Sequence, residues 1–124
     1  MRHAYEVKDS GNRDEFPTGM VRDTQDNKSR PDLISPYFLE RLGEHLRKGA
    51  VKYNEHNWCK GQPFSRAWAS LNRHVMQYAM GDKSEDHLAA IAFGAMVLSH
   101  YEEMIKLGWL PKELDDMIDY EEMK

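Results

Sequence analysis

The apolar segment from Leu88 to Leu98 constrains the fold of this chain more than any other feature of its sequence. A helix without a polar side has to be surrounded by other elements, so we expect this segment to form the centre of the fold. Ser84 is predicted to be the N-cap of this helix, and Glu85 and Asp86 follow it in the first turn, where acidic side chains suit the positive end of the helix dipole. We expect the helix to continue to Gly108, and its apolar run is too short to span a bilayer.

Two amphipathic helices are predicted to cover this central helix. Ser35 followed by proline is a typical helix start, and apolar residues at three- or four-residue spacing then predict a helix over 36–53. Ser65 is predicted to cap a second helix that ends near Gly81. A short fourth helix is predicted within 112–122. No segment shows the alternation of a strand, so the predicted fold class is all-α, a small bundle of three or four helices.

Residues 1–34 differ from the rest of the chain because they are polar and rich in turn-forming residues. We expect them to form an irregular N-terminal arm, and residues 35–124 to form the helical domain. A central helix that is apolar all round, covered by only about three others, still leaves apolar surface uncovered. We therefore expect a homo-oligomer to complete its burial.

The composition excludes several classes of protein. The single cysteine, Cys59, cannot form an intrachain disulfide, which excludes a secreted disulfide scaffold. The first residues lack the apolar core of a signal peptide, so we expect a soluble, cytoplasmic protein without a membrane partner. A net charge of -4 and a pI near 5.8 argue against a stable complex with DNA or RNA, which requires a basic surface.

The charge is distributed unevenly along the chain. Residues 22–73 carry ten Lys or Arg and six Asp or Glu, whereas residues 82–122 carry three Lys and eleven acidic residues. Such opposite charges either solvate the surface of the domain, or converge on a phosphorylated ligand whose phosphates meet the basic part and whose metal meets the acidic part. Both interpretations stay open at this point.

The loop that follows the first predicted helix carries candidate substrate-binding residues. Lys52 and Lys60 offer ammonium groups for phosphates, and Arg73 in the second helix offers a guanidinium. Asn57 offers an amide for a base or sugar edge, and Trp58 offers a ring for stacking. In the alternative interpretation Trp58 closes the end of the bundle, Asn57 caps a turn and the lysines lie in water.

A second group of candidates lies around the start of the central helix. Hard divalent cations prefer carboxylate oxygens, so Glu44, Glu85 and Asp86 are candidate ligands of Mg²⁺. His74 and Asp86 are the candidate catalytic residues, and either His74 or His87 could serve as general base, His74 being the better candidate. In the alternative interpretation Glu85 and Asp86 are only acidic residues of a first helical turn.

Several short blocks, taken together and in order, resemble a bacteriophage and prophage domain, the dATP/dGTP diphosphohydrolase N-terminal domain. The blocks are Gly19–Thr24, Arg30–Pro36, Lys48–Tyr53, Asn57–Gly61, Arg73–His74 and Glu85–Ala90. The resemblance implies Mg-dependent hydrolysis of a purine deoxynucleoside triphosphate to the monophosphate and diphosphate. It also implies a role in the nucleotide pool of a phage, in the cytoplasm of an infected or lysogenic bacterial host.

Two other functions stay open. A non-catalytic nucleotide-binding protein would use the same basic loop to sequester nucleotides, including cyclic or ADP-ribose-derived defence signals. A structural or adaptor protein would use its charges only for solvation. Both nucleotide functions require that the basic loop after the first helix and the acidic start of the third helix lie face to face around a polyphosphate.

Overall fold

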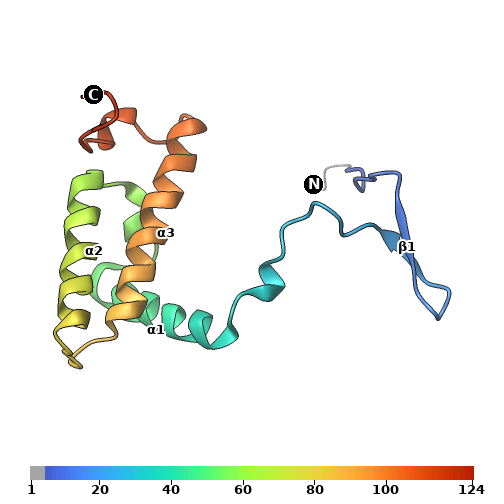
Figure 1. The fold of residues 1–124 in the computed structure, drawn as a ribbon, viewed down its shortest axis with the longest axis horizontal. Helices are drawn as coiled ribbons and strands as arrows, with labels where there is room; N and C mark the ends of the chain where they lie inside the picture. The colour runs from blue at the N-terminus through green and yellow to red at the C-terminus, as the bar shows by residue number, and fades with distance from the viewer. Residues whose placement is uncertain (1–4) are drawn as a thin grey trace. The chain divides into compact units, whose positions relative to one another are not determined.

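The computed structural model of the chain describes residues 5–124 (Figure 1). Its contacts divide these residues into an N-terminal unit that ends at Ile34 and a helical unit that begins at Ser35. In the described residues the helical unit holds three α-helices and two 3-10 turns, and the N-terminal unit adds a third such turn and a two-stranded sheet, so the chain is mostly helical. These elements are α1 (Pro36–Tyr53), α2 (Phe64–Ala79), α3 (His87–Lys106), the 3-10 turns η1 (Pro31–Leu33), η2 (Asn57–Lys60) and η3 (Lys112–Leu114), and strands β1 (Arg13–Glu15) and β2 (Val21–Asp23).

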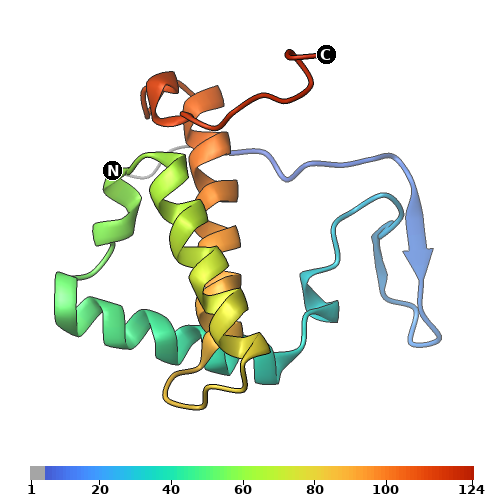
Figure 2. The same ribbon diagram turned by 60° about the vertical axis from the view of Figure 1, so that its left-hand side comes forward.

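In the helical unit α2 and α3 pack side by side and run in opposite directions, and α1 crosses near the end at which α3 begins (Figures 1 and 2). Gly94 of α3 permits the close approach of α2, because a Cβ at this position would lie only 3.0 Å from Cδ1 of Leu71. The buried core lies between these two helices and consists of Phe64, Ala67, Val97 and Tyr101.

The predicted first helix is confirmed with its bounds. Ser35 is the N-cap of α1, and its hydroxyl accepts a hydrogen bond from the backbone N–H of Phe38 at 3.2 Å. Pro36 occupies the first helical position, where its missing N–H costs nothing. The local sequence therefore determines where α1 begins.

The predicted capping of the second helix by Ser65 is wrong, and so is the predicted fourth helix. α2 begins at Phe64, two residues earlier than a cap at Ser65 predicts, so Ser65 lies in the first turn of the helix. Ser65 donates its backbone N–H and its hydroxyl to the carboxylate of Asp116, at 2.8 and 2.6 Å. This negative charge suits the positive end of α2. Over 112–122 the chain forms only η3 and irregular structure, and the segment places Asp116 at the start of α2.

The predicted central helix is confirmed, but its predicted N-cap, Ser84, is wrong. The N-cap is Asp86, whose carboxylate accepts from the backbone N–H of Ala89 at 3.1 Å. The helix is not fully surrounded within one chain, because Leu88 is 42% exposed and Ala95 is also exposed. By length and composition alone α3 could cross a membrane, so the prediction that its apolar run is too short to do so does not hold for the helix as a whole. Its buried side chains against α1 and α2 make it the core helix of this unit.

The N-terminal unit contains a β-hairpin and is not the wholly irregular arm that the sequence predicts. β1 pairs antiparallel with β2, with Arg13 opposite Asp23. Both strands are three residues long and lie almost entirely exposed, so they leave no alternating apolar pattern in the sequence. The carboxylate of Asp23 pairs with Arg13 across the hairpin, and it also bonds to Ser10 before the hairpin and Lys28 after it.

Candidate functional site

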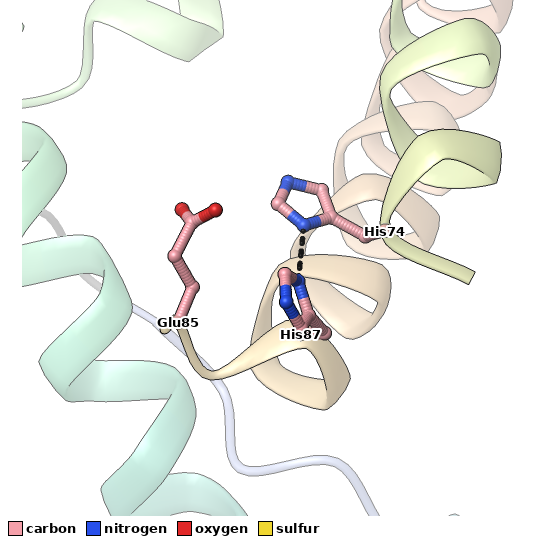
Figure 3. A group of neighbouring side chains, drawn as sticks. All are labelled: His74, Glu85 and His87. Atoms are coloured by element: carbon pink, nitrogen blue, oxygen red, sulfur yellow. Dashed lines mark hydrogen bonds between the residues drawn. The ribbon is translucent and has the colours of Figure 1, made fainter. Parts of the chain in front are cut away.

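The start of α3 brings together three side chains that can bind a metal ion (Figure 3). His74 comes from α2, Glu85 from the segment before α3, and His87 from the first turn of α3, and one ligand atom of each lies within 4.8 Å of the others. Among residues 5–124 this is the one group of three or more such ligands. We refer to these three residues as the histidine cluster. His87 is buried, His74 is half-buried and Glu85 is exposed, so solvent reaches the cluster from the Glu85 side.

A chain of hydrogen bonds orients the two imidazoles. Nε2 of His87 lies 2.8 Å from Oδ2 of Asp82, and Nδ1 of His87 lies 2.9 Å from Nδ1 of His74. A carboxylate only accepts, so Nε2 of His87 carries a proton and Nδ1 of the neutral ring keeps its lone pair. Nδ1 of His74 then donates to that lone pair, which leaves the lone pair of neutral His74 on Nε2. Hydrogen bonds from Ser84 and from His87 lower the pKa of Asp82 to about 2, so this carboxylate is charged.

Asp86 has two structural partners. Its carboxylate accepts from Nε and Nη2 of Arg41 on α1, at 2.8 and 2.6 Å, and also caps α3. This pairing with Arg41 is the main reason that the pKa of Asp86 falls to about 2. Asp86 therefore fixes α1 against the start of α3.

One side of α1 carries positive charge toward the histidine cluster. Arg41, His45, Lys48 and Lys52 follow a spacing of four, three and four residues, which places them along one side of a helix. The Arg41–Asp86 pair and the packing of the His45 ring at 5.0 Å from the Phe93 ring turn this side toward α3. We refer to the four residues as the basic face of α1.

Neighbouring groups shift the pKa values of two residues of the basic face, His45 and Lys52. Burial lowers the pKa of His45, and the nearby His74 and Lys48 lower it further, so His45 is neutral at pH 7. A hydrogen bond with Tyr53 raises the pKa of Lys52, and the carboxylate of Glu85 adds to this effect. Lys52 is thus a full positive charge within electrostatic reach of the cluster.

Two hollows adjoin the histidine cluster. The first has a volume of about 140 Å³, lies between α2 and α3, and is lined mainly by apolar side chains together with His45, Gln62, Ser70 and His74. The second has a volume of about 130 Å³ and lies at the turn from α2 to α3. It is lined by Arg41, Tyr78, Asp82, Lys83, Glu85, Asp86, His87 and Leu88. The cluster contributes to both hollows, so a ligand in either one would touch it.

The loop after α1 lies against a later part of α3. The ring of Trp58 packs on His100 and Phe93, at centroid distances of 4.9 and 6.3 Å, and its carbonyl accepts from the hydroxyl of Tyr101 at 2.5 Å. His100 lies roughly 20 Å along the helix from His87, at 1.5 Å per residue. The required juxtaposition of this loop with the start of α3 is therefore wrong within one chain, because Trp58 closes the bundle far from that start. A nucleotide site at the start of α3 needs cationic groups from another element.

Other predicted binding residues lie outside the histidine cluster. Asn57 and Lys60 are exposed in η2, beside Trp58. Arg73 is exposed on α2, and as the neighbour of His74 it points about 100° away around the helix. None of these three belongs to the group of close ligands in the described part of the chain.

The three predicted magnesium ligands do not converge. Glu44 pairs with Arg47 on α1 at 2.6 Å, and Asp86 is held by Arg41. Only Glu85 lies in the histidine cluster, beside two imidazoles. A protein cage of carboxylate oxygens, which Mg²⁺ prefers, is therefore not present among residues 5–124.

The family model described as dATP/dGTP diphosphohydrolase, N-terminal, matches residues 18–108, well over half of the chain. The chain belongs to this family. No curated protein and no solved structure matches it significantly. The matched range of the dATP/dGTP diphosphohydrolase N-terminal family includes the whole basic face of α1 and the whole histidine cluster, whereas Asp116 lies beyond it.

Sequence reasoning missed several residues of this site. Arg41, His45 and Lys48 lie beside the cluster, and Asp82 orients His87. The sequence does contain a regular spacing of basic residues and His45 along the first helix. That spacing predicts a binding face only once the side of the helix that contacts α3 is known.

Proposed function

We propose that this member of the dATP/dGTP diphosphohydrolase N-terminal family hydrolyses a purine deoxynucleoside triphosphate to the monophosphate and diphosphate. The observation that carries the proposal is the placement of the basic face of α1 beside a hydrogen-bonded histidine pair and two hollows. Cationic groups bind phosphates, and a positioned imidazole can accept a proton from water.

In this proposal the triphosphate lies along the basic face of α1. Lys48 and Lys52 are exposed and contribute flexible ammonium groups, which suit phosphate oxygens. Arg41 is already paired with Asp86, so its main role is to hold α1 in place. Phosphate binding is thus assigned chiefly to the two lysines.

His74 is the proposed general base. Its Nε2 lone pair accepts a proton from a water molecule, whose oxygen forms a bond to the α-phosphorus while the bond from that phosphorus to the bridging oxygen breaks. The diphosphate leaves with the electron pair of the broken bond. Asp82 and His87 position the ring of His74 through the hydrogen-bond chain and do not touch the substrate.

The purine is proposed to enter the first hollow. Gln62 and Ser70 provide polar groups among its apolar lining, a combination that is typical of small-molecule sites. Trp58, predicted to stack on the base, is already packed against Phe93 and His100. The base is therefore assigned to a different part of the molecule than the sequence indicates.

Magnesium does not fit as an ion held by this chain alone. Two of its three predicted carboxylate ligands are paired with arginines, and the third lies beside nitrogen ligands. No step of the proposal is assigned to Mg²⁺ bound by protein side chains. Mg²⁺ remains in the assay because triphosphates carry it in solution.

The direct test is to incubate the purified full chain with dGTP or dATP and Mg²⁺, and to separate the products by chromatography. We expect monophosphate and diphosphate well above the level in a boiled control. His74→Gln should remove the activity, whereas His56→Asn should keep it, because His56 is exposed and has a left-handed backbone that Asn accepts. Equal product from the wild type and the boiled control would contradict the proposal.

One observation favours the alternative of nucleotide binding without cleavage. Glu44 and Asp86 are neutralised by arginines, which leaves basic residues but few free carboxylates near the cluster. A protein that only sequesters nucleotides needs the basic residues and does not need free carboxylates. Calorimetry with nucleoside triphosphates and cyclic nucleotides, first in EDTA and then in Mg²⁺, separates the two, since tight binding in EDTA without product indicates sequestration.

We also propose that the chain acts as a homo-oligomer in the cytoplasm of a bacterial host. Leu88 is 42% exposed on the core helix, and Trp68 and Val75 on α2 are 47% and 41% exposed. Large apolar side chains of this kind, when they gather on one face, commonly mark association surfaces. Light scattering after size-exclusion chromatography measures the subunit number, and a monomer would contradict this part of the proposal.

A further inference from the structure

We infer that the histidine cluster is a binding site for a divalent transition metal ion of the Zn²⁺ or Co²⁺ class, held by His74, Glu85 and His87. This goes beyond the proposed function, which assigns no metal to these residues.

The separation of the two imidazole nitrogens matches that of ligands on one ion. Nδ1 of His74 and Nδ1 of His87 are 2.9 Å apart. With metal–nitrogen bonds of about 2.0–2.1 Å, two nitrogens at a right angle on an ion are about 2.9 Å apart, and two at a tetrahedral angle about 3.3–3.4 Å. The separation of the two nitrogens therefore needs to change by a few tenths of an ångström at most. The half-buried ring of His74 also has to turn, because its Nδ1 points at Nδ1 of His87 in the hydrogen bond, whereas both lone pairs must point at a bound ion.

Asp82 already holds His87 in the form that a metal requires. Its carboxylate accepts a hydrogen bond from Nε2–H of His87, 2.8 Å away, so the lone pair lies on Nδ1 and points to His74. An acidic side chain behind a metal-binding histidine is a recurring arrangement that orients the ring and raises its basicity. His87 is also buried, with only 1% of its side chain exposed, so its ring is held in one place.

The third ligand and the charges favour a metal with affinity for nitrogen. Glu85 is exposed and has no ion pair among the described residues, so its carboxylate is free to turn toward the imidazoles. Imidazole ligands suit Zn²⁺, Co²⁺ and Ni²⁺, whereas Mg²⁺ prefers oxygen. Three protein ligands leave a further position for water, as in catalytic zinc sites.

The metal-bound and metal-free forms differ at His74. When Nδ1 of His74 binds a metal, its proton moves to Nε2, and the lone pair that serves as the proposed base is no longer available. Metal binding is therefore a property that can be measured without nucleotide. Its presence or absence says nothing by itself about whether the metal-free chain hydrolyses a triphosphate.

The test is calorimetric titration of the metal-free full chain with Zn²⁺, Co²⁺ or Mg²⁺, together with the visible absorption of bound Co²⁺. We expect Zn²⁺ and Co²⁺ to bind in a one-to-one ratio, and Mg²⁺ much more weakly. Glu85→Gln and His74→Gln should weaken Zn²⁺ binding by about tenfold or more, and Asp82→Asn by about 10–100-fold, as for other residues that orient a ligand. Glu85 is exposed, so Glu85→Gln should fold normally.

Matched controls separate this site from scattered surface ligands. Glu44→Gln and His56→Asn remove the same kinds of side chain elsewhere in the helical unit, and Cys59→Ser removes the thiol. All three should leave Zn²⁺ affinity unchanged within about twofold. Zn²⁺ binding no tighter than Mg²⁺ binding, or controls that weaken it as much as Glu85→Gln, would overturn the inference.

Discussion

Both ends of α3 carry polar side chains that are held by hydrogen bonds, but the two ends use them differently. At the later end, the hydroxyl of Tyr101 is bonded to the carbonyl of Trp58, and the Trp58 ring lies between Phe93 and His100. At the starting end, the histidine cluster leaves a carboxylate exposed and a histidine lone pair free. The later end thus contributes stability, while the starting end retains groups that can act on a ligand.

This difference shows why residue types alone do not identify a site. The loop with lysines, asparagine and tryptophan has the composition of a nucleotide site, but its tryptophan belongs to the core. The start of α3 has fewer such residues, yet it gathers ligand atoms within 4.8 Å of one another. The loop after α1 and the start of α3 therefore differ in where their side chains lie and in which hydrogen bonds those side chains already make.

The largest expected effect is at the later end. Tyr101 is fully buried and packs on Phe64 with ring centroids 5.9 Å apart, so Tyr101→Ala should lower the free energy of unfolding by about 3–5 kcal/mol. Urea unfolding followed by circular dichroism measures it. Glu85→Gln is the matched change at the other end and should stay within about 0.5 kcal/mol of the wild type. Comparable losses in both variants would remove the distinction between the two ends.

The second prediction compares the lysines of the two regions in nucleotide binding. Lys48→Ala combined with Lys52→Ala should weaken binding of a non-hydrolysable dGTP analogue by about tenfold or more, because charge-assisted hydrogen bonds to phosphate are lost. Lys60→Ala, in η2, should change it by less than about twofold. Calorimetry at low and high salt measures both. A larger loss of affinity from Lys60→Ala than from the double variant would indicate that the nucleotide binds at the loop after α1.

The smallest predicted effect concerns Asp86. Asp86→Ala should lower the free energy of unfolding at pH 7 by about 1 kcal/mol through loss of the N-cap. Asp86→Asn should lose less, because Asn also caps, and the ion pair with Arg41 is partly solvent-screened.

The same ion pair predicts a dependence on pH. The pKa of Asp86 falls from 3.8 to about 2 in the folded state. A lowered pKa means that the pair stabilises the fold fully above the unfolded value, and that this stabilisation is lost as the pH falls from about 4 toward 2. The wild type should therefore lose more stability than Asp86→Asn over this range. Parallel curves for the two proteins, from urea unfolding at each pH, would contradict the assignment.

The helices were predictable because their signals are local. Ser35 and the proline after it determine the start of α1, and the apolar run from Leu88 determines the core helix. The hairpin was not predictable, since its short exposed strands bury no alternating face. The cap of α2 was not predictable either, because it comes from Asp116, 51 residues after Ser65.

The candidate site was predictable only in part. His74 and Glu85 were singled out because of their residue types and their position beside a helix start, and the structure brings them together. The contribution of α1 depends on how that helix is rotated against α3, which Arg41 and Asp86 determine across 45 residues of sequence. No local pattern encodes such a rotation, so the basic face of α1 became visible only in three dimensions.

The carboxylate of Asp116 accepts hydrogen bonds at the start of α2, although Asp116 lies outside the range that matches the family. A chain shortened to end at residue 108 would keep every residue of the histidine cluster. It would lose the acceptor at the first turn of α2, and also Leu110 and Leu114, which pack against the core. The part of the chain that matches the family and the part that supports α2 therefore differ in length, because residues beyond the match contact the start of α2 and the core.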